Sequence, residues 1–401
     1  MVREVWITGI GLVSSLGEGI DAHWAALAVA ERPTPVVDLT FTPPFGIHPM
    51  VPLELDKQIP RKSDQRQMEP WQRLGTYAAG LALDDAGIAG NTDILSHTHA
   101  IVAADGGERD VPTDTAILEG LGHASPKAAW LNERLSNDLR PTLFLAQLPN
   151  LVAGNISIVH NVTGSSRTFM GEEIAGLSAT EVALRRIAAG QGDIFLVGGA
   201  CLAERKDSIL NCALGGKLWV GEHLPIWERL DKGGGAMLGS VGAFFVMEAR
   251  EHAEVRGRKP YARLVDVRTD QSRRRPGDVS AKLTRQFDEI LPPGSPPVAV
   301  LSAAPGVAEV TREEQDVLSG WTGAGRIGAV RATASMLGAA TSAAFPAAAG
   351  LAALALSRRA LYRPLDATGF EQPSDTAPAQ ILVTSAGIWR GEGMALLAAV
   401  E

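Results

Sequence analysis

The alternation of short apolar segments with amphipathic helical segments is the feature of this sequence that most constrains its fold. In the first half, residues 5–7, 100–104 and 194–197 have the composition of short strands. Residues 72–86 and 175–189 have helical periodicity, and glycines close several of these segments. Strands that alternate with helices favour an α/β fold in which helices cover both faces of a sheet.

The second half of the chain begins the same pattern again. Strand-like runs occupy residues 243–247, 262–265, 298–301 and 381–383. The most apolar stretch, Ala339 to Leu356, is crowded with Ala and contains a proline. A lipid span of about 20 residues would be richer in Leu, Ile and Val, so we predict a buried core helix here and no transmembrane segment.

Three stretches break the pattern, at residues 41–70, 268–297 and 363–379. All are rich in Pro or in charge, and we expect them to be surface loops. The second stretch contains the basic run Arg273 to Arg275. We interpret this run as a solvated loop, with contact to an acidic partner as the alternative.

The composition excludes several classes of function. The 401 residues include 37 Lys and Arg against 45 Asp and Glu, a net charge of -8, and no basic stripe of the kind that nucleic acid requires. Cys201 and Cys212 are the only cysteines, which excludes a disulfide framework and a four-cysteine metal site. Two cysteines fit a reducing cytosol, and Met1 leads into the first strand without an export signal. We therefore expect a cytoplasmic protein without a metal or another cofactor.

Three segments in the middle of the chain carry a family resemblance. Leu148 to Ile158, Gly171 to Gly176 and Asp193 to Ala200 align without a gap along one region. This region resembles the nucleophile region of the type II beta-ketoacyl-ACP synthases, and similar segments extend the resemblance over nearly the whole chain. The resemblance implies a thiolase-like fold, a five-layer αβαβα sandwich of two similar halves, which we place at residues 1–250 and 251–401.

The catalytic residues of that family are missing at the positions that resemble them. The active-site cysteine falls on Glu173, and a carboxylate would form at best a mixed anhydride that water destroys. The other positions are a first histidine, a lysine and a second histidine, which fall on Ala304, Val330 and Ser335. The last histidine of the chain is His252 and the last lysine is Lys282, so none remains farther on. The resemblance implies that the chain does not condense acyl groups.

A pocket around the acidic pair Glu172 and Glu173 is the candidate site. The glycine-rich stretch 384–393 aligns with the gating loop of the family and contributes Gly387 and Arg390. Because an unpaired buried carboxylate is costly, we expect Glu173 to be ionised and held by backbone N–H groups and by an arginine. The candidates are Arg390 and Arg331, which adjoins the missing lysine. The alternative is an ordinary acidic helix start with ordinary surface arginines.

Three functions follow from the resemblance. The first is a silent partner of an intact beta-ketoacyl-ACP synthase subunit, like the chain-length factors of type II polyketide synthases, in a heterodimer that works with an acyl carrier protein. The second is a malonyl-ACP decarboxylase, although Ala304, Val330 and Ser335 offer little to stabilise a developing enolate. The third is an enzyme that uses Glu173 in another way. We favour the partner subunit.

Overall fold

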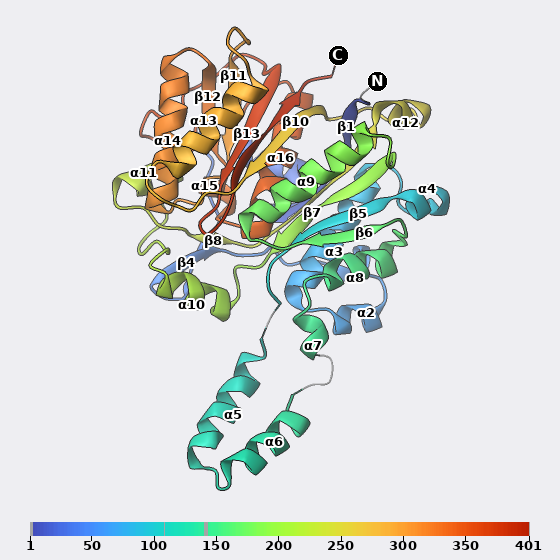
Figure 1. The fold of residues 1–401 in the computed structure, drawn as a ribbon, viewed down its shortest axis with the longest axis vertical. Coiled ribbons are helices and arrows are strands. Elements are labelled where there is room, and N and C mark those ends of the chain that lie inside the picture. The colour runs from blue at the N-terminus through green and yellow to red at the C-terminus, as the bar shows by residue number, and fades with distance from the viewer. Residues whose placement is uncertain (1–2, 108, 140–142, 401) are drawn as a thin grey trace.

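The computed structural model describes residues 3–107, 109–139 and 143–400 (Figure 1). Ten strands form one continuous path of a mixed sheet. The strands of the first half are β1 (Val5–Ser14), β5 (His99–Ala104), β6 (Ser166–Phe169), β7 (Ile194–Cys201) and β9 (Val241–Ala249). Those of the second half are β10 (Ala262–Asp270), β11 (Val298–Ser302), β12 (Ile327–Ala332), β13 (Gln380–Ala386) and β14 (Glu392–Ala398).

The strand order reveals a duplication that the residues themselves do not. Counted from the outer edge inward, each half places its third, second, fourth, fifth and first strands side by side, as β6-β5-β7-β9-β1 and as β12-β11-β13-β14-β10. In each half the outer three strands are parallel and the inner two pair antiparallel. The halves meet where β1 pairs antiparallel with β10. The division of the chain at residue 250 stays a prediction.

Helices cover the outer faces of the two halves of the sheet, and two further helices pack between the halves. The larger ones are α3 (Pro70–Asp85), α8 (Leu151–His160), α9 (Glu173–Ala188), α13 (Asp278–Ile290), α14 (Ala308–Gly323) and α16 (Thr341–Ser357). In the first half α3 packs on β1 and β9 and against α8, while in the second α13 packs on β14 and against α14. Between them, α9 and α16 pack against each other and against strands of both halves. These layers confirm the expected αβαβα sandwich.

The remaining elements are shorter or peripheral. A second sheet contains β3 (Asp38–Thr42), β4 (Phe45–His48) and β8 (Leu238–Gly239), and β2 (Gly17–Glu18) pairs with β1. The other helices are α1 (Gly19–Leu27), α2 (Lys62–Gln67), α4 (Thr92–His97), α5 (Val111–His123), α6 (Lys127–Asn137), α7 (Leu143–Ala146), α10 (Lys206–Leu214), α11 (Ile226–Asp231), α12 (Arg250–Val255), α15 (Ala334–Leu337) and the 3₁₀ helix η1 (Leu55–Lys57).

The predicted core helix is α16, which is buried along most of its length. It crosses α9 closely because Gly176 has no side chain: a Cβ there would lie 2.6 Å from Pro346 Cδ and 2.7 Å from the Ser342 carbonyl oxygen. Pro346 has no N–H to donate to that carbonyl, so the proline falls where the two helices approach. Among the described residues no helix is long and apolar enough to cross a membrane.

Two of the predicted loops contain regular structure, and one long insertion was not expected. The stretch 41–70 holds β4, η1 and α2, and 268–297 holds α13, whose apolar face is buried through Val279, Leu283 and Phe287. These three residues recur every four positions, a helical signal that the flanking prolines and charges hid. Only 363–379 lacks helix and strand, as predicted. The helices α5 and α6 form a hairpin that projects away from the sandwich (Figure 1).

Candidate functional site

A sharp turn between β6 and α9 presents the acidic pair. Gly171 has a φ of 137° and Glu172 a φ of 52°, and Glu173 is the first residue of the helix. A glutamate in the left-handed region costs on the order of 1 to 3 kcal/mol, so the surrounding structure must hold this turn. The turn directs the two neighbouring carboxylates differently: Glu172 is partly exposed and Glu173 is buried.

Glu173 is only 4% exposed and pairs with no arginine of the described residues. Its Oε1 accepts a hydrogen bond from the backbone N–H of Ile388 at 2.9 Å, and its Oε2 has no partner among the described residues. Burial, with smaller contributions from Asp105 and Glu172, raises the pKa of Glu173 to about 7. A backbone N–H holds Glu173 as expected, but the expected arginine partner was wrong, because Arg390 pairs with Glu172 and Arg331 lies elsewhere. Burial also acts against the expected ionisation of the carboxyl group.

Arg390 pairs with the other acid. Its Nε lies 3.5 Å from Glu172 Oε2, in a partly exposed ion pair of a kind that contributes little to stability. Gly387 lies directly against Glu173, since a Cβ at this position would come within 2.6 Å of Glu173 Oε2. The loop between β13 and β14 therefore covers the start of α9, and only a residue without a side chain fits there.

Arg331 does not belong to this site. It is buried on β12, where its Nε donates to the carbonyl of Tyr362 at 2.7 Å and its Nη1 to that of Gln372 at 2.9 Å. Neighbouring residues of a strand point to opposite faces. Val330 enters the core of the second half, and Arg331 points toward the segment that follows α16. Adjacency to Val330 in sequence was thus a poor guide to its position.

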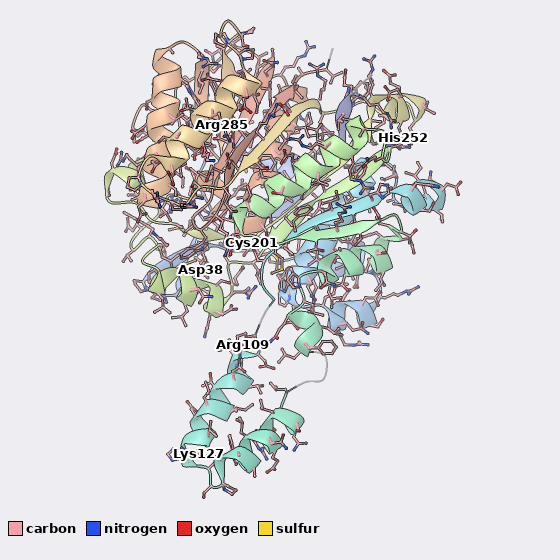
Figure 2. The ribbon with its side chains drawn as sticks, in the orientation of Figure 1. Asp38, Arg109, Lys127, Cys201, His252 and Arg285 are labelled. Atoms are coloured by element: carbon pink, nitrogen blue, oxygen red, sulfur yellow. The ribbon has the colours of Figure 1, made fainter. Side chains whose placement is uncertain are left out.

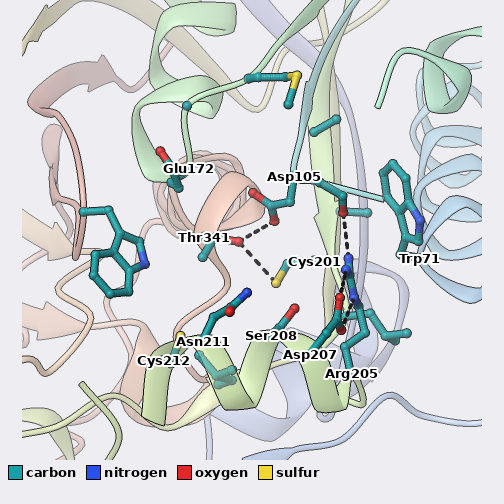
Figure 3. Close-up of a pocket in the computed structure, with 18 residues that line it drawn as sticks. Trp71, Asp105, Glu172, Cys201, Arg205, Asp207, Ser208, Asn211, Cys212 and Thr341 are labelled. Carbon is teal, nitrogen blue, oxygen red and sulfur yellow. Dashed lines mark hydrogen bonds and ion pairs between the residues drawn. The ribbon is translucent and has the colours of Figure 1, made fainter. Parts of the chain in front are cut away.

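A pocket of about 370 Å³ opens beside Glu172 (Figure 3). It lies where the parallel strands β5, β6 and β7 end, the edge at which ligands bind in α/β sheets. Asp105, directly after β5, accepts hydrogen bonds from the hydroxyls of Thr341 and Ser342 at 2.5 and 3.0 Å. Burial raises the pKa of Asp105 as well. The pocket thus has a polar wall built around a partly buried acid.

Arg205 closes one side of this pocket. Its guanidinium donates to the carbonyls of Gly106 and Gly107 at 2.7 and 2.9 Å, and it forms an ion pair with Asp207 at 2.6 Å (Figure 3). These bonds tie α10 to the chain that leaves β5. The guanidinium of Arg205 therefore has a structural role, because its bonds hold the segment after β5 against α10.

Both cysteines of the chain line the pocket, yet neither is a ready nucleophile. Thr341 Oγ1 lies 3.3 Å from Cys201 Sγ. Burial, with a smaller contribution from Asp105, raises the pKa of the Cys201 thiol far above its ordinary value. Burial also raises the pKa of Cys212 to about 11. Because the thiolate is the reactive form, neither cysteine is poised to act as a nucleophile.

The other three positions singled out in the sequence contribute no proton-transfer group. Ala304 follows β11 and is buried, and Val330 belongs to the core of the second half. Ser335, in α15, accepts a hydrogen bond from the backbone N–H of Ile226 at 3.0 Å. None of the three lines the pocket. In the described part of the chain, no group of three or more His, Cys, Asp or Glu could hold a metal ion.

Several residues of the site were not found from the sequence. Asp105 had a usable signal, because it directly follows a predicted buried strand. Arg274 had none. It lies in the basic run interpreted as a solvated loop, but its guanidinium is largely buried, pairs with Glu392 at 2.5 Å and donates to the carbonyls of Gly387 and Gly391 at 2.8 and 2.9 Å. Arg274 clamps the loop that covers Glu173, which corrects that interpretation at Arg274, whereas Arg273 and Arg275 are exposed as predicted. Figure 2 shows Cys201, which lines the pocket, in the body of the fold, with Lys127 on the projecting hairpin.

The arrangement supports proton binding better than acyl transfer. Glu173 is a buried acid whose pKa is raised to about 7 by burial, with the charge of Asp105 contributing. A carboxyl group of this kind can hold or release a proton near neutral pH. A thiolate poised at the start of the helix is missing from the described residues of this site.

Comparisons with known proteins identify relatives of this chain. The chain is 27% identical over 286 residues to 3-oxoacyl-[acyl-carrier-protein] synthase 2 of Rhizobium meliloti (strain 1021), covering 66% of this chain and 63% of that protein. It is 27% identical over 271 residues to the enzyme of the same name from Vibrio cholerae serotype O1, covering 66% and 62%. The chain thus spans less than two thirds of the length of these relatives.

Solved structures share the fold over the full length. The structure described as the ishigamide ketosynthase/chain length factor matches with a TM-score of 0.80 at 19% identity, covering 100% of both chains. A beta-ketoacyl synthase from Burkholderia phymatum STM815 matches with a TM-score of 0.77 at 17% identity, again covering 100% of both. A model of the beta-ketoacyl synthase N-terminal domain matches residues 2–251, more than half of the sequence. The chain therefore belongs to the beta-ketoacyl synthase family.

Proposed function

We propose that this protein is a catalytically silent member of its family, which acts as the chain-length-factor-like partner of an intact beta-ketoacyl-ACP synthase in acyl chain elongation. The observation that carries the proposal is Glu173 at the start of α9, the family's nucleophile position, with two protonated cysteines nearby. Condensation needs a thiolate that can be acylated and can pass the acyl group on, whereas a carboxylate forms at best a mixed anhydride that water destroys. In such a pair the intact subunit would perform the chemistry and accept the acyl carrier protein.

An uncovered sheet edge supports the partnership. β6 ends the strand order and pairs only with β5 among the described strands. Large apolar side chains are exposed at Ile158 (65%) on α8, which packs on β6, at Met170 (61%), which follows β6, and at Phe144 (62%) on α7. An uncovered edge strand can pair with another chain, and exposed apolar patches mark protein contacts. We assign this edge to the intact synthase subunit.

The first test is covalent. Purified alone and incubated with acyl-ACP, the chain should show no acyl adduct by intact mass, while an intact synthase run in parallel is acylated. Glu173→Cys should not restore condensation with malonyl-ACP, because Ala304, Val330 and Ser335 also lack the family's groups and such groups act as a unit. An acyl adduct on the wild-type chain, or ketoacyl product from it, would exclude a silent subunit.

The second test is assembly. Co-expression with the cognate intact synthase should give a 1:1 complex that buries more than about 2,000 Å², as obligate interfaces do. A homodimer that ignores every intact synthase encoded in the same organism would count against the partnership.

A second candidate function is an enzyme that uses Glu173 as an acid or base, and one observation favours it. The pKa of Glu173, about 7, is close to the value at which a carboxylate transfers protons most effectively at neutral pH. Glu173→Gln distinguishes the two functions in the reconstituted pair. A silent subunit keeps product formation when the complex still assembles, whereas a catalytic carboxylate loses the product with assembly unchanged.

A further inference from the structure

A buried arginine without a counter-ion lies in the second half of the molecule, outside the pocket described above. Arg229, on α11, has an exposed fraction of 0%. Its Nε, Nη1 and Nη2 all lack a hydrogen-bond partner among the described residues. A buried guanidinium with no acceptor for its donors costs several kcal/mol, so a group that supplies acceptors would be bound strongly.

Two histidines adjoin this arginine. The rings of His48, on β4, and His223 are 5.4 Å apart and meet edge to face. His223 Nε2 donates to the carbonyl of Ser335 at 2.9 Å, which leaves Nδ1 without its proton in the neutral ring. Burial, followed by the charge of Arg229, lowers the pKa of His223 to about 4. For His48 burial also lowers the pKa well below its ordinary value, with His223 and Arg229 contributing.

The nearest acids are engaged elsewhere. Glu228 forms an ion pair with Arg32 at 2.6 Å and accepts the backbone N–H of Ala367 at 2.9 Å. Glu371 accepts hydrogen bonds from Trp227 at 3.1 Å and from two backbone N–H groups. Burial alone lowers the pKa of Arg229, to about 10, with no carboxylate acting against it. Arg229 thus stays charged at neutral pH, while the neighbouring Glu228, which acts on His223, is paired with Arg32.

The cluster has a definite position relative to the fold and to solvent. Arg229 Nη2 would lie 3.3 Å from a Cβ at Gly306, in the loop that follows β11. Gly306 has a φ of 91°, which favours glycine and keeps the neighbourhood of the guanidinium free of a side chain. His223 is partly exposed, so the cluster reaches the surface at that ring.

We propose that Arg229, His48 and His223 form a binding site for a small oxyanion, with Arg229 as its principal ligand. The guanidinium presents paired N–H donors whose spacing matches carboxylate or phosphate oxygens. A bound oxyanion supplies the acceptors that the described residues do not and favours protonation of the two histidines. This site is independent of the partnership proposed above, since none of its residues lines the pocket or the β6 edge.

The test measures thermal unfolding of the full chain in sodium chloride, phosphate or acetate at equal pH and ionic strength. Phosphate or acetate should raise the Tm of the wild type by roughly 2 to 4 °C relative to chloride. Arg229→Met should abolish this response, because the apolar side chain fills the site without donors. Arg66→Met, which removes an exposed arginine on α2, should respond as the wild type does.

Two results would overturn the site. One is a wild type whose Tm is the same in all three salts, and the other is an Arg229→Met variant that responds as strongly as the wild type. If Arg229→Met does not fold, Arg229→Lys replaces it, because lysine keeps the charge and loses the paired donors. Titration of phosphate or acetate should then require at least a tenfold higher concentration for the same shift, and an unchanged titration would overturn the proposal.

Discussion

The pKa of Glu173 is set by burial, which disfavours the ionised form more than the start of the helix favours it. The start of a helix stabilises a negative charge by about 0.3 to 1 kcal/mol, and by up to about 2 in partly buried sites. Its pKa nevertheless rises from 4.5 to about 7. Because each pKa unit corresponds to about 1.4 kcal/mol, removal from water disfavours the ionised form by about 3 kcal/mol net. The single hydrogen bond from Ile388 does not offset that cost.

This balance predicts a pH-dependent difference in stability. When folding raises the pKa of an acid, the acid is protonated in both states at any pH below its unfolded-state pKa. The protein then loses stability as the pH rises from that pKa through the folded-state pKa. Wild-type protein should therefore lose up to about 3 kcal/mol relative to Glu173→Gln between about pH 4.5 and pH 8. Urea unfolding of both proteins across this range measures it, with Glu172→Gln as a control for loss of charge at the same helix end. Parallel curves for wild type and Glu173→Gln would contradict the assigned burial.

Among the structural elements, the loop between β13 and β14 depends on a segment far away in sequence. Arg274, 118 residues before Glu392, holds both ends of this loop through Gly387 and Gly391. The loop carries the N–H of Ile388 that binds Glu173. The cover of the acidic pair is therefore stabilised by one largely buried guanidinium.

Loss of this clamp should loosen the loop without unfolding the sandwich. Arg274→Met removes charge-assisted hydrogen bonds worth about 1.5 to 3 kcal/mol each and leaves Glu392 unpaired. Hydrogen exchange of residues 387–391 should accelerate at least tenfold, while exchange in β7 stays as in the wild type. Arg275→Met, which changes the exposed neighbouring arginine, is the matched control. Equal exchange in both variants would show that Arg274 does not hold the loop.

At the scale of the whole molecule, the repeated strand order gives the sheet two outer edges with different surroundings. Both end on the third strand of their half, β6 or β12. Exposed Ile158, Phe144 and Met170 all belong to residues 143–170, the segment that contains β6. The hairpin of α5 and α6 also belongs to the first half of the chain, and its Leu118 is 69% exposed. The first half thus presents the surface that we assign to a partner.

A charge placed on this surface should weaken the complex. Ile158→Asp would bury an unpaired carboxylate at the interface and should raise the Kd for the cognate synthase at least about tenfold, that is, by about 1.4 kcal/mol or more. Val255→Asp, at an 89% exposed position on α12, is the control and should bind as the wild type does. Sedimentation or light scattering of the purified mixtures measures both. Unimpaired binding by Ile158→Asp would place the interface elsewhere.

The sequence by itself determined the fold class, and the resemblance predicted that Glu173, Ala304, Val330 and Ser335 occupy the family's catalytic positions. Apolar runs such as those in β5, β7 and β11 are local signals, because strands buried on both faces carry their hydrophobicity in consecutive residues. The resemblance fixed Glu173 at the start of α9 by aligned motifs, and no knowledge of packing was needed for that. Resemblance also supplied the layered architecture, which the residues did not reveal.

Only the tertiary structure decided how the site is paired. Arg331 adjoins Val330 in sequence but points to the opposite face of β12, and Arg274 reaches the loop over Glu173 from a segment that looked like a solvated surface. Neither contact has a local signal, because both depend on which face of a strand is covered and on residues more than 30 positions apart. The charge state of Glu173 follows from burial, and burial is a property of the assembled layers rather than of the residues beside it.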